Sequence, residues 1–353
     1  MPAKYQHAIN RILAYVREQQ LERDDRLPSE REFERLLDIG RPALNKAVAC
    51  LIDQGALRRE GYKLYYMGEA EVKSGPPPIH VINPSGVLKA PYDVAEELGS
   101  HTIPVLVGNA DDEHKVLTRL LQTGTNGFVI WPQFQSRARD LLEQFQHVGI
   151  PFVVCDQDLG AFDFVGVDNE EGSRLAVEHL KKRGHRNIVY ITQSLAVPSL
   201  ARRCEGYRQA CLAGRMRRSA SQIIEIPDQS VEHCAFAFAE LRQKYPAATA
   251  IISSNDLVVL RVLEAVKAAG LRIPEDLSAV GFDDIEAAAL ASPALTTVKQ
   301  DFYEIGILAT QLLFRRMAKK RPPMSSDPIR IKVAPSLIQR ASTARVQTRR
   351  SGV

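Results

Sequence analysis

The chain has 353 residues, enough for two or three domains, and its 45% hydrophobic and 25% charged residues are typical of a globular protein. No stretch approaches the roughly 18 consecutive apolar residues of a membrane span, and the charged N-terminus lacks the apolar run of a signal peptide, so we expect a cytoplasmic protein without membrane contact. The five cysteines show no CxxC or Cys/His clustering, which argues against a disulfide framework and a structural zinc. A net charge of +4 is too small to indicate nucleic-acid binding without a local motif.

The first 67 residues predict three helices and a hairpin. Apolar residues at helical spacing mark the first helix, and Ser29 with Glu32 forms a capping box that begins the second. Pro42 is tolerated at the first position of a third helix, which Gly55 ends. The stretch LRREGYKLYYM then reads as two short strands around a turn at Gly61. Residues 1–67 are therefore predicted to form a winged helix-turn-helix DNA-binding domain.

Residues 68–78 (GEAEVKSGPPP) are polar and then proline-rich, without helical or strand periodicity. Consecutive prolines favour an extended, semi-rigid spacer. We expect an interdomain linker here.

Beyond the linker, short apolar runs alternate with amphipathic segments of about ten to fifteen residues, which is typical of parallel sheets buried on both faces. The predicted strands are 79–82, 104–108, 127–131, 151–155, 187–191, 222–226, 250–253 and 277–282. Eight strands fit two stacked doubly wound lobes better than one barrel, because 283–300 reads as irregular. The prediction is an α/β fold with a two-lobed effector-binding and dimerisation domain at 79–343 and a flexible tail at 344–353.

The N-terminal LPSEREFERLLDIGRPALNKAVACLIDQGALRREGYKLYY resembles GntR-type winged helices in its LPSERE box and in RPxxxKA at the matching distance. The resemblance implies that the box arginine, the start of the third helix and the wing contact double-stranded operator DNA. The implied DNA-binding residues are Arg31, Arg41, Pro42, Ala43, Asn45, Lys46, Gly61 and Lys63. Gly40 and Asn45 depart from the family pattern, so the preferred bases are not transferable, although an asparagine amide can read adenine.

The remainder, from about 79 to 343, resembles the effector domain of LacI/GalR-type regulators, which is built like a periplasmic sugar-binding protein. The matching stretches include VGVDNEEGSRLAVEHLKKRGHRNIVYI, RCEGYRQA, AIISSNDLVVLRVLEAVKAAGLRIPEDLSAVGFDDIE and LTTVKQDFYEIG. Combined with a winged domain and a proline linker, they resemble the arabinose-repressor type of architecture.

Ligands of open parallel sheets bind beyond the carboxyl ends of strands, where polar residues follow several of the apolar runs. Asp156, Asn255 and Asp283 follow predicted strands, and Arg203 lies in the RxxGY pattern. Carboxylates and amides can form hydrogen bonds with the paired hydroxyls of a sugar. The resemblance implies that Arg203 binds effector hydroxyls or a carboxylate. The effector-binding prediction comprises Ser85, Ala90, Pro91, Trp131, Asp156, Arg203, Asn255, Asp283, Gln300 and Phe302.

Several residues in this region are open to a purely structural explanation. Trp131 could stack on a sugar ring or simply fill a core. Asp256 is expected to cap the helix after Asn255, and Asp168 with Asn169 to cap the helix at Glu171. The histidines of the region lack a cysteine or carboxylate set, so no metal is expected.

Together these features predict a homodimeric transcriptional regulator, a repressor released by a small carbohydrate-type effector, without catalytic residues, metal or cofactor. Pentoses, hexoses, sugar acids and purines all fit the chemistry of arginine, aspartate and asparagine. The alternative is a sugar-acting or sugar-binding cytosolic protein with an accessory DNA-binding domain. The chain lacks GxSxG, GxxxxGK[ST] and HExxH motifs, which disfavours an enzyme.

Overall fold

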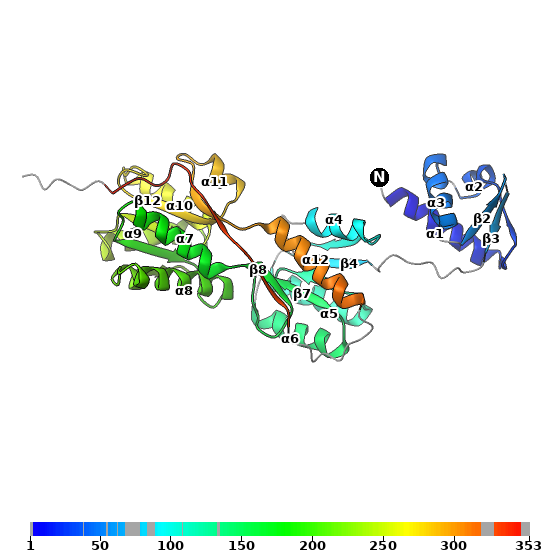
Figure 1. Cartoon of the computed structure of the whole chain (residues 1–353), viewed down its shortest axis with the longest axis horizontal. Helices are drawn as coiled ribbons and strands as arrows, with labels where there is room; N and C mark the ends of the chain where they lie inside the picture. The colour runs from blue at the N-terminus through cyan, green and yellow to red at the C-terminus, as the bar shows by residue number, and fades with distance from the viewer. Residues whose placement is uncertain are drawn as a thin grey trace, which may run out of the picture. The chain divides into compact units, whose positions relative to one another are not determined.

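The computed structural model describes residues 3–37, 39–53, 56–61, 63–67, 78–82, 89–107, 109–132, 135–318 and 328–346. The chain divides into two compact units, Met1–Pro77 and Pro78–Val353 (Figure 1). In the parts of the chain described, no helix is both long and apolar enough to cross a membrane. The predicted linker, apart from Pro78, lies outside the described residues.

The first unit contains three helices and a three-stranded antiparallel sheet in the order β1-β3-β2. Its elements are α1 (Ala3–Glu18), β1 (Arg26–Leu27), α2 (Glu30–Leu36), α3 (Arg41–Asp53), β2 (Leu57–Glu60) and β3 (Lys63–Tyr66). The three helices and the hairpin are those predicted. Strand β1 was missed, because two residues are too few to show an alternating pattern.

One buried cluster holds the first unit together. Ile12, Phe33, Leu44, Leu51 and Leu64 come from all three helices and from β3, and each is at most 2% exposed. Burying such a side chain contributes about 1.5–3 kcal/mol. The helices therefore owe their mutual arrangement to this core.

The predicted capping box sets the start of α2. Glu32 N donates to Ser29 Oγ at 3.4 Å, and Ser29 N donates to Glu32 Oε2 at 2.7 Å. The Ser29 hydroxyl, which donates to Glu32 Oε2 at 2.7 Å, and the Ser29 amide lower the pKa of Glu32. Two amides at the helix start are thereby satisfied, which fixes where α2 presents Arg31.

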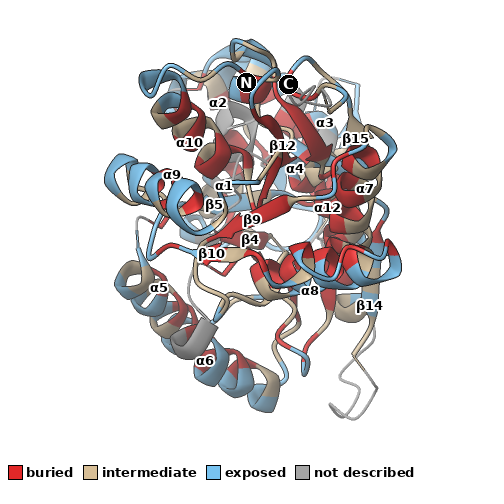
Figure 2. Cartoon of the chain, turned by 90° about the vertical axis from the view of Figure 1, so that its left-hand side faces the viewer, coloured by how far each residue is buried: buried red, intermediate tan, exposed pale blue. Residues whose placement is uncertain are grey.

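The second unit has two lobes, each built on a six-stranded sheet. The first sheet runs β14-β8-β7-β6-β4-β5 and is parallel throughout. The second runs β10-β9-β11-β12-β13-β15, with only β15 antiparallel to its neighbour. This confirms the predicted two-lobed α/β fold. In Figure 2 the strands are largely buried, whereas the helices have exposed outer faces.

The bounds of these elements fix the positions used below. First-lobe strands are β4 (Ile79–Ile82), β5 (Thr102–Val105), β6 (Phe128–Ile130), β7 (Phe152–Cys155), β8 (Phe164–Val167) and β14 (Arg330–Val333). Second-lobe strands are β9 (Ile188–Thr192), β10 (Ile223–Glu225), β11 (Ala250–Ser253), β12 (Ser278–Asp283), β13 (Thr296–Lys299) and β15 (Ser336–Ile338). The helices are α4 (Lys89–Glu97), α5 (Ala110–Thr123), α6 (Gln135–Val148), α7 (Asn169–Lys182), α8 (Pro198–Ala213), α9 (Val231–Lys244), α10 (Asp256–Ala268), α11 (Glu286–Leu290) and α12 (Phe302–Ala318), with the 3-10 helix η1 (Ser219–Ser221).

The sequence prediction missed β8, β13, β14 and β15. The stretch 283–300, read as irregular, contains α11 and the buried strand β13. Its residues Thr296 and Thr297 are polar yet fully buried, because their hydroxyls hydrogen-bond to Arg340 O and to Asp256. The strand predicted at 104–108 lies at 102–105, at the half-exposed edge of its sheet, where the apolar pattern is weak.

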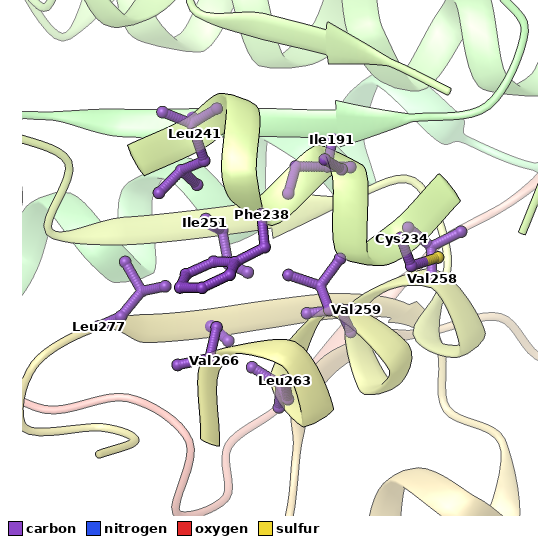
Figure 3. Close-up of a cluster of buried hydrophobic side chains, with 14 of the residues drawn as sticks. Ile191, Cys234, Phe238, Leu241, Ile251, Val258, Val259, Leu263, Val266 and Leu277 are labelled. Carbon is purple, nitrogen blue, oxygen red and sulfur yellow. The ribbon is translucent and has the colours of Figure 1, made fainter. Parts of the chain in front are cut away.

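The chain crosses between the lobes three times, after β8, β13 and β14. Helix α12 thus packs on the first lobe although it follows the second in sequence, as Figure 1 shows. The second lobe has its own core, in which Phe238 of α9 lies among Val259 and Val266 of α10 and Ile251 of β11 (Figure 3). The two lobes therefore have separate hydrophobic clusters and are joined by three crossings of the chain.

Candidate effector site and DNA interface

Arg203 lies at the centre of a buried polar cluster at the carboxyl ends of the strands. Its guanidinium, 4% exposed, donates to Asp283 Oδ1 at 3.1 Å, Asn169 Oδ1 at 2.7 Å and Ser254 O at 2.5 Å. The guanidinium carbon also lies 3.9 Å from the centroid of the Phe282 ring. The arginine is held by partners on three sides, so its position is fixed before any ligand arrives.

Asp156 brings the first lobe into this cluster. It follows β7, and its Oδ1 lies 3.8 Å from a terminal nitrogen of Arg203 in the second lobe. Gln157 Nε2 donates to Asp156 Oδ2 at 2.8 Å and to Ser199 Oγ at 3.0 Å, and Ser199 begins the facing helix α8. The predicted core residues Asp156, Arg203 and Asp283 are therefore brought together from both lobes.

Gln300 completes the cluster beyond the end of β13. Its Nε2 donates to Asp283 Oδ1 at 2.6 Å. The buried Oε1 of Gln300 and Oδ1 of Asp156 accept no hydrogen bond in the described part of the chain. Buried acceptors without donors are costly, by about 1–3 kcal/mol each, unless a ligand or water supplies the hydrogen.

The backbone around the cluster is strained. Asp156, Asp283 and Asp284 have φ values of 63°, 119° and 59°, in the region that favours glycine. Such conformations cost about 1–3 kcal/mol each and persist where neighbours hold them in place. Asp284 is held by Arg340, whose guanidinium donates to Asp284 Oδ1 at 2.6 Å. Asp156 and Asp283, at the ends of β7 and β12, lie 3.8 and 3.1 Å from guanidinium nitrogens of Arg203.

Burial raises the pKa of both cluster aspartates. The pKa of Asp283 rises to about 6, against the lowering effects of Arg203 and Gln300, and the pKa of Asp156 also rises. The folded protein therefore binds more protons than the unfolded chain between about pH 4 and 6. The raised pKa of Asp283 therefore adds to the free energy of unfolding most fully at and below about pH 4. This contribution is lost as the pH rises through about 6.

We expect the effector affinity to have the opposite pH dependence. A ligand hydroxyl donates to an ionised carboxylate, so binding of a neutral polyol should weaken as the pH falls below about 6, by up to about tenfold per pH unit. Calorimetric titrations from pH 5 to 8 measure this dependence. Asp283→Asn should flatten it, leaving only the part due to Asp156. An affinity that is constant from pH 5 to 8 contradicts the assignment of Asp283.

The remaining predicted effector residues occupy varied positions. Asn255 caps α10 by accepting from Val258 N at 2.8 Å, while its Nδ2 donates to Gln193 at 2.7 Å. The expectation that Asp256 caps this helix was wrong. Asp256 is buried and accepts from Thr297 Oγ1 and Ile285 N, with burial raising its pKa to about 7.

Four other predicted residues lie in the core of the first lobe. Trp131 follows β6 and is 4% exposed, and Ala90 with Pro91 is buried on α4. Phe302 packs against the same cluster. Ser85 lies outside the described residues. A ligand role for these five residues stays a prediction.

The sequence prediction missed several members of the cluster. Asp168 caps α7 as predicted, accepting from Glu171 N at 3.3 Å, but Asn169 binds Arg203 instead of capping. Gln157, Ser199 and Gln193 also contact the predicted set. Gln157 and Gln193 each lie within two residues of a strand end, which is a signal that could have found them.

Gly206 controls how closely α8 approaches α7. A Cβ at this position would lie 2.4 Å from Glu170 O, closer than any side-chain carbon tolerates. We expect Gly206→Ala to push the two helices apart and to displace Arg203, one turn earlier on α8. Effector affinity should fall at least tenfold, with a destabilisation of about 1–3 kcal/mol. Calorimetry and urea unfolding test this, with Ala210→Gly on the same helix as a control for helix propensity alone.

The first unit presents the predicted DNA-contacting residues largely on its surface. Arg31, Arg41, Pro42 and Asn45 are exposed and Ala43 is half-buried. The side chain of Lys46 is outside the described set. Gly61, with φ +56°, and Lys63 are exposed at the tip of the β2–β3 hairpin.

Ion pairing distinguishes these cations from their neighbours. Among the described residues Arg31, Arg41 and Lys63 form no ion pair, whereas Arg58 pairs with Asp24 and Glu60. Arg59 pairs with Glu30. In the amide orientation that satisfies its hydrogen bonds, the side-chain nitrogen of Asn45 donates to Glu30 Oε2 at 3.3 Å. The unpaired cations are the ones available to neutralise phosphates.

The sequence predicts neither a disulfide framework nor a structural metal, and the structure describes four of the five cysteine side chains. Cys155, Cys204, Cys211 and Cys234 are free and buried. His179 is buried and bonds Thr343. Within the described ranges, no group of three histidine, cysteine or carboxylate side chains is placed to hold a metal ion.

The second unit matches proteins of known class. A family model described as a periplasmic binding protein-like domain matches residues 177–343. The ribose operon repressor of Halalkalibacterium halodurans is 28% identical over 260 residues, 72% of this chain and 74% of that protein. The transcriptional repressor PurR of Yersinia pestis is 30% identical over 240 residues, 67% of this chain and 68% of that protein.

A solved structure shows the same arrangement of lobes. A LacI-family transcriptional regulator from Enterococcus faecium with bound ribose superposes with a TM-score of 0.64 at 26% identity, covering 76% of this chain and all of that one. Fold and cluster thus define a two-lobed ligand-binding unit of the periplasmic-binding-protein type. The chain belongs to the LacI/GalR family of transcriptional regulators. The family model matches part of the second unit and none of the first, so the GntR type of the first unit stays a prediction.

Proposed function

We propose that this regulator is a repressor and that its effector binds at the Arg203 cluster. The effector is a small neutral polyol, such as a sugar, and its binding causes the protein to dissociate from operator DNA. The observation that carries the proposal is a cluster in which one guanidinium and two aspartates from both lobes converge. Two of its buried acceptor atoms, on Asp156 and Gln300, accept no hydrogen bond within the described residues. Hydroxyl hydrogens are the donors that such acceptors lack.

The charge of the cluster favours a neutral ligand. Arg203 is already opposed by Asp156 and Asp283, so its positive charge is offset within 4 Å. An anionic ligand such as a sugar acid would be brought close to two carboxylates, which is unfavourable at low dielectric. The ribose operon repressor and the ribose-bound structure among the relatives support the sugar class.

Contacts between the two lobes at the site allow a bound ligand to change the arrangement of the lobes. Arg203 with Asp156 and Gln157 with Ser199 join the two lobes at the site itself. A ligand inserted here changes these contacts, so it has different affinities for different lobe arrangements, which is the requirement for shifting a conformational equilibrium. In a dimer, altered lobe geometry changes the spacing of two DNA-reading domains relative to operator half-sites.

We assign operator binding to residues 1–67, as a winged helix-turn-helix of the GntR type, with 68–78 as linker and 79–343 as effector domain. The LPSERE box, the capped α2 and the exposed cations of α2, α3 and the hairpin support this assignment. The domain limits and the GntR type are part of the proposal.

A homodimer fits the surface of the first lobe. Tyr92, Leu98, Ile103 and Leu106 are exposed on α4, on the edge strand β5 and in the adjoining turns, with Leu106 77% exposed. Clustered apolar residues beside an open sheet edge are typical of an interface. Sedimentation of the full chain measures the oligomeric state.

A thermal-shift screen of the full chain against pentoses, hexoses and sugar acids tests the effector proposal, because a bound ligand raises the melting temperature by mass action. We expect stabilisation by neutral sugars and release of operator DNA by the same compounds. Turnover of any stabilising sugar would instead favour the alternative of a sugar-acting protein. A sugar that binds at saturation without changing operator affinity would refute the coupling.

A further inference from the structure

A strongly basic pocket lies in the second lobe, away from the Arg203 cluster. It has a volume of about 680 Å³, in the range of small-molecule sites. Five of its nine lining residues are cationic and none is acidic. They are Lys181, Arg186, Arg215, Arg217 and Arg218, together with Asn187, Ala213, Gly214 and Met216.

The pocket is separated from the effector site by the sheet itself. Asn187 precedes β9, whereas Asp283 and Gln300 lie at or beyond the carboxyl ends of the neighbouring parallel strands. The five residues of β9 span about 17 Å. The two sites are therefore at opposite ends of the same sheet.

The cations are not neutralised by the protein. Within the described residues none of the five forms an ion pair, and Arg186 makes only a 3.4 Å hydrogen bond to Gly214 O. Cations near helix C-termini often stabilise the helix dipole, and this explains Lys181 at the end of α7 and Arg186 beside the end of α8. It does not explain Arg215, Arg217 and Arg218, which lie beyond the last turn of α8.

The backbone conformation at Arg215 favours glycine, so the structure alone does not explain an arginine at this position. Helix α8 ends in a Schellman motif, in which Arg215 N donates to Leu212 O at 3.0 Å and Met216 N to Cys211 O at 2.8 Å. Arg215 has φ 60°, at the position of this motif that favours glycine. An arginine is less favourable than glycine in this left-handed conformation. Arg215 nevertheless lines the pocket.

We propose that this pocket is a second ligand site, which binds a small molecule carrying two or more phosphate groups. Arginine guanidinium groups bind phosphate oxygens through paired hydrogen bonds, and several convergent arginines favour a multiply charged anion over a single carboxylate. The concave shape and size fit a small molecule, whereas a nucleic acid backbone is matched by an extended basic groove.

The unusual backbone of Arg215 supplies a test that does not endanger folding. Calorimetric titration of the full chain with inorganic pyrophosphate, at fixed ionic strength, should show saturable binding to one site per chain. Arg215→Gly should weaken this binding at least tenfold while leaving the melting temperature equal or higher, because glycine relieves the backbone. Adding Arg217→Gln should abolish binding. Arg208→Gln, an exposed arginine earlier on α8, is the matched control and should bind as the unmodified chain does.

Several results would overturn the proposal. These are no saturable binding at millimolar pyrophosphate, binding that inorganic sulfate displaces at equal concentration, or unchanged affinity in Arg215→Gly. Equal loss in the Arg208→Gln control would assign the effect to general surface charge. If the Arg215 variant bound pyrophosphate normally but lost operator affinity, the arginines would belong to a DNA contact instead.

Discussion

Arg203→Ala is expected to abolish effector binding and to destabilise the second unit. The guanidinium binds Asp283, Asn169 and Ser254 and opposes Asp156; its side chain is buried, and the two aspartates are partly buried. Removing one partner of a buried ion pair leaves uncompensated charge and costs about 3–5 kcal/mol. Effector affinity should fall by more than 100-fold, because the aspartates lose the group that orients them. Urea unfolding and calorimetric titration measure the two effects separately.

A double variant distinguishes loss of stability from loss of binding. Arg203→Met combined with Asp283→Asn removes both charges of the closest pair, and we expect it to recover much of the stability of Arg203→Ala. It should not recover effector binding. Effector binding that survives Arg203→Ala would contradict the site assignment.

Arg41→Ala and Arg31→Ala are expected to weaken operator binding without changing effector affinity. Both arginines are exposed and form no ion pair among the described residues, and they lie at or near the starts of α3 and α2. Removing one cation that neutralises a DNA phosphate should lower the slope of log affinity against log salt by about 0.9, and affinity by about tenfold. Lys46→Ala should do the same. Gel shifts at several salt concentrations measure both quantities.

The first unit provides matched controls for this prediction. Arg35 is also exposed on α2 but near its C-terminal end, and Arg58 is paired with Asp24 and Glu60. Arg35→Ala and Arg58→Ala should leave the salt slope nearly unchanged. An equal loss in Arg35→Ala and Arg31→Ala would show that total charge, and not the LPSERE and RPxxxKA positions, controls binding.

The sequence by itself determined the features that depend on local pattern. The capping box at Ser29, the hairpin turn at Gly61 and the near-continuous apolar strands follow from residue spacing, and the structure contains them. Asp156 and Asp283 were predicted because residues after parallel strands meet at one edge of a sheet. Arg203 was predicted from the RxxGY pattern and the family resemblance. The structure brings these three together, while their role with a ligand remains for the titrations to test.

The tertiary structure alone decided which polar groups are buried and what satisfies them. Strand β13 escaped prediction because Thr296 and Thr297 are hydrophilic, and only their hydrogen bonds to Arg340 O and Asp256 make burial tolerable. Asn255 caps α10 in place of Asp256, because the Asp256 carboxylate accepts from Thr297 of β13 and from Ile285 N, both far away in sequence. The basic pocket likewise joins the end of α7, the start of β9 and the end of α8. Hydrophobic periodicity is a property of neighbours in sequence, whereas the pairing of buried charges depends on segments that only folding brings together.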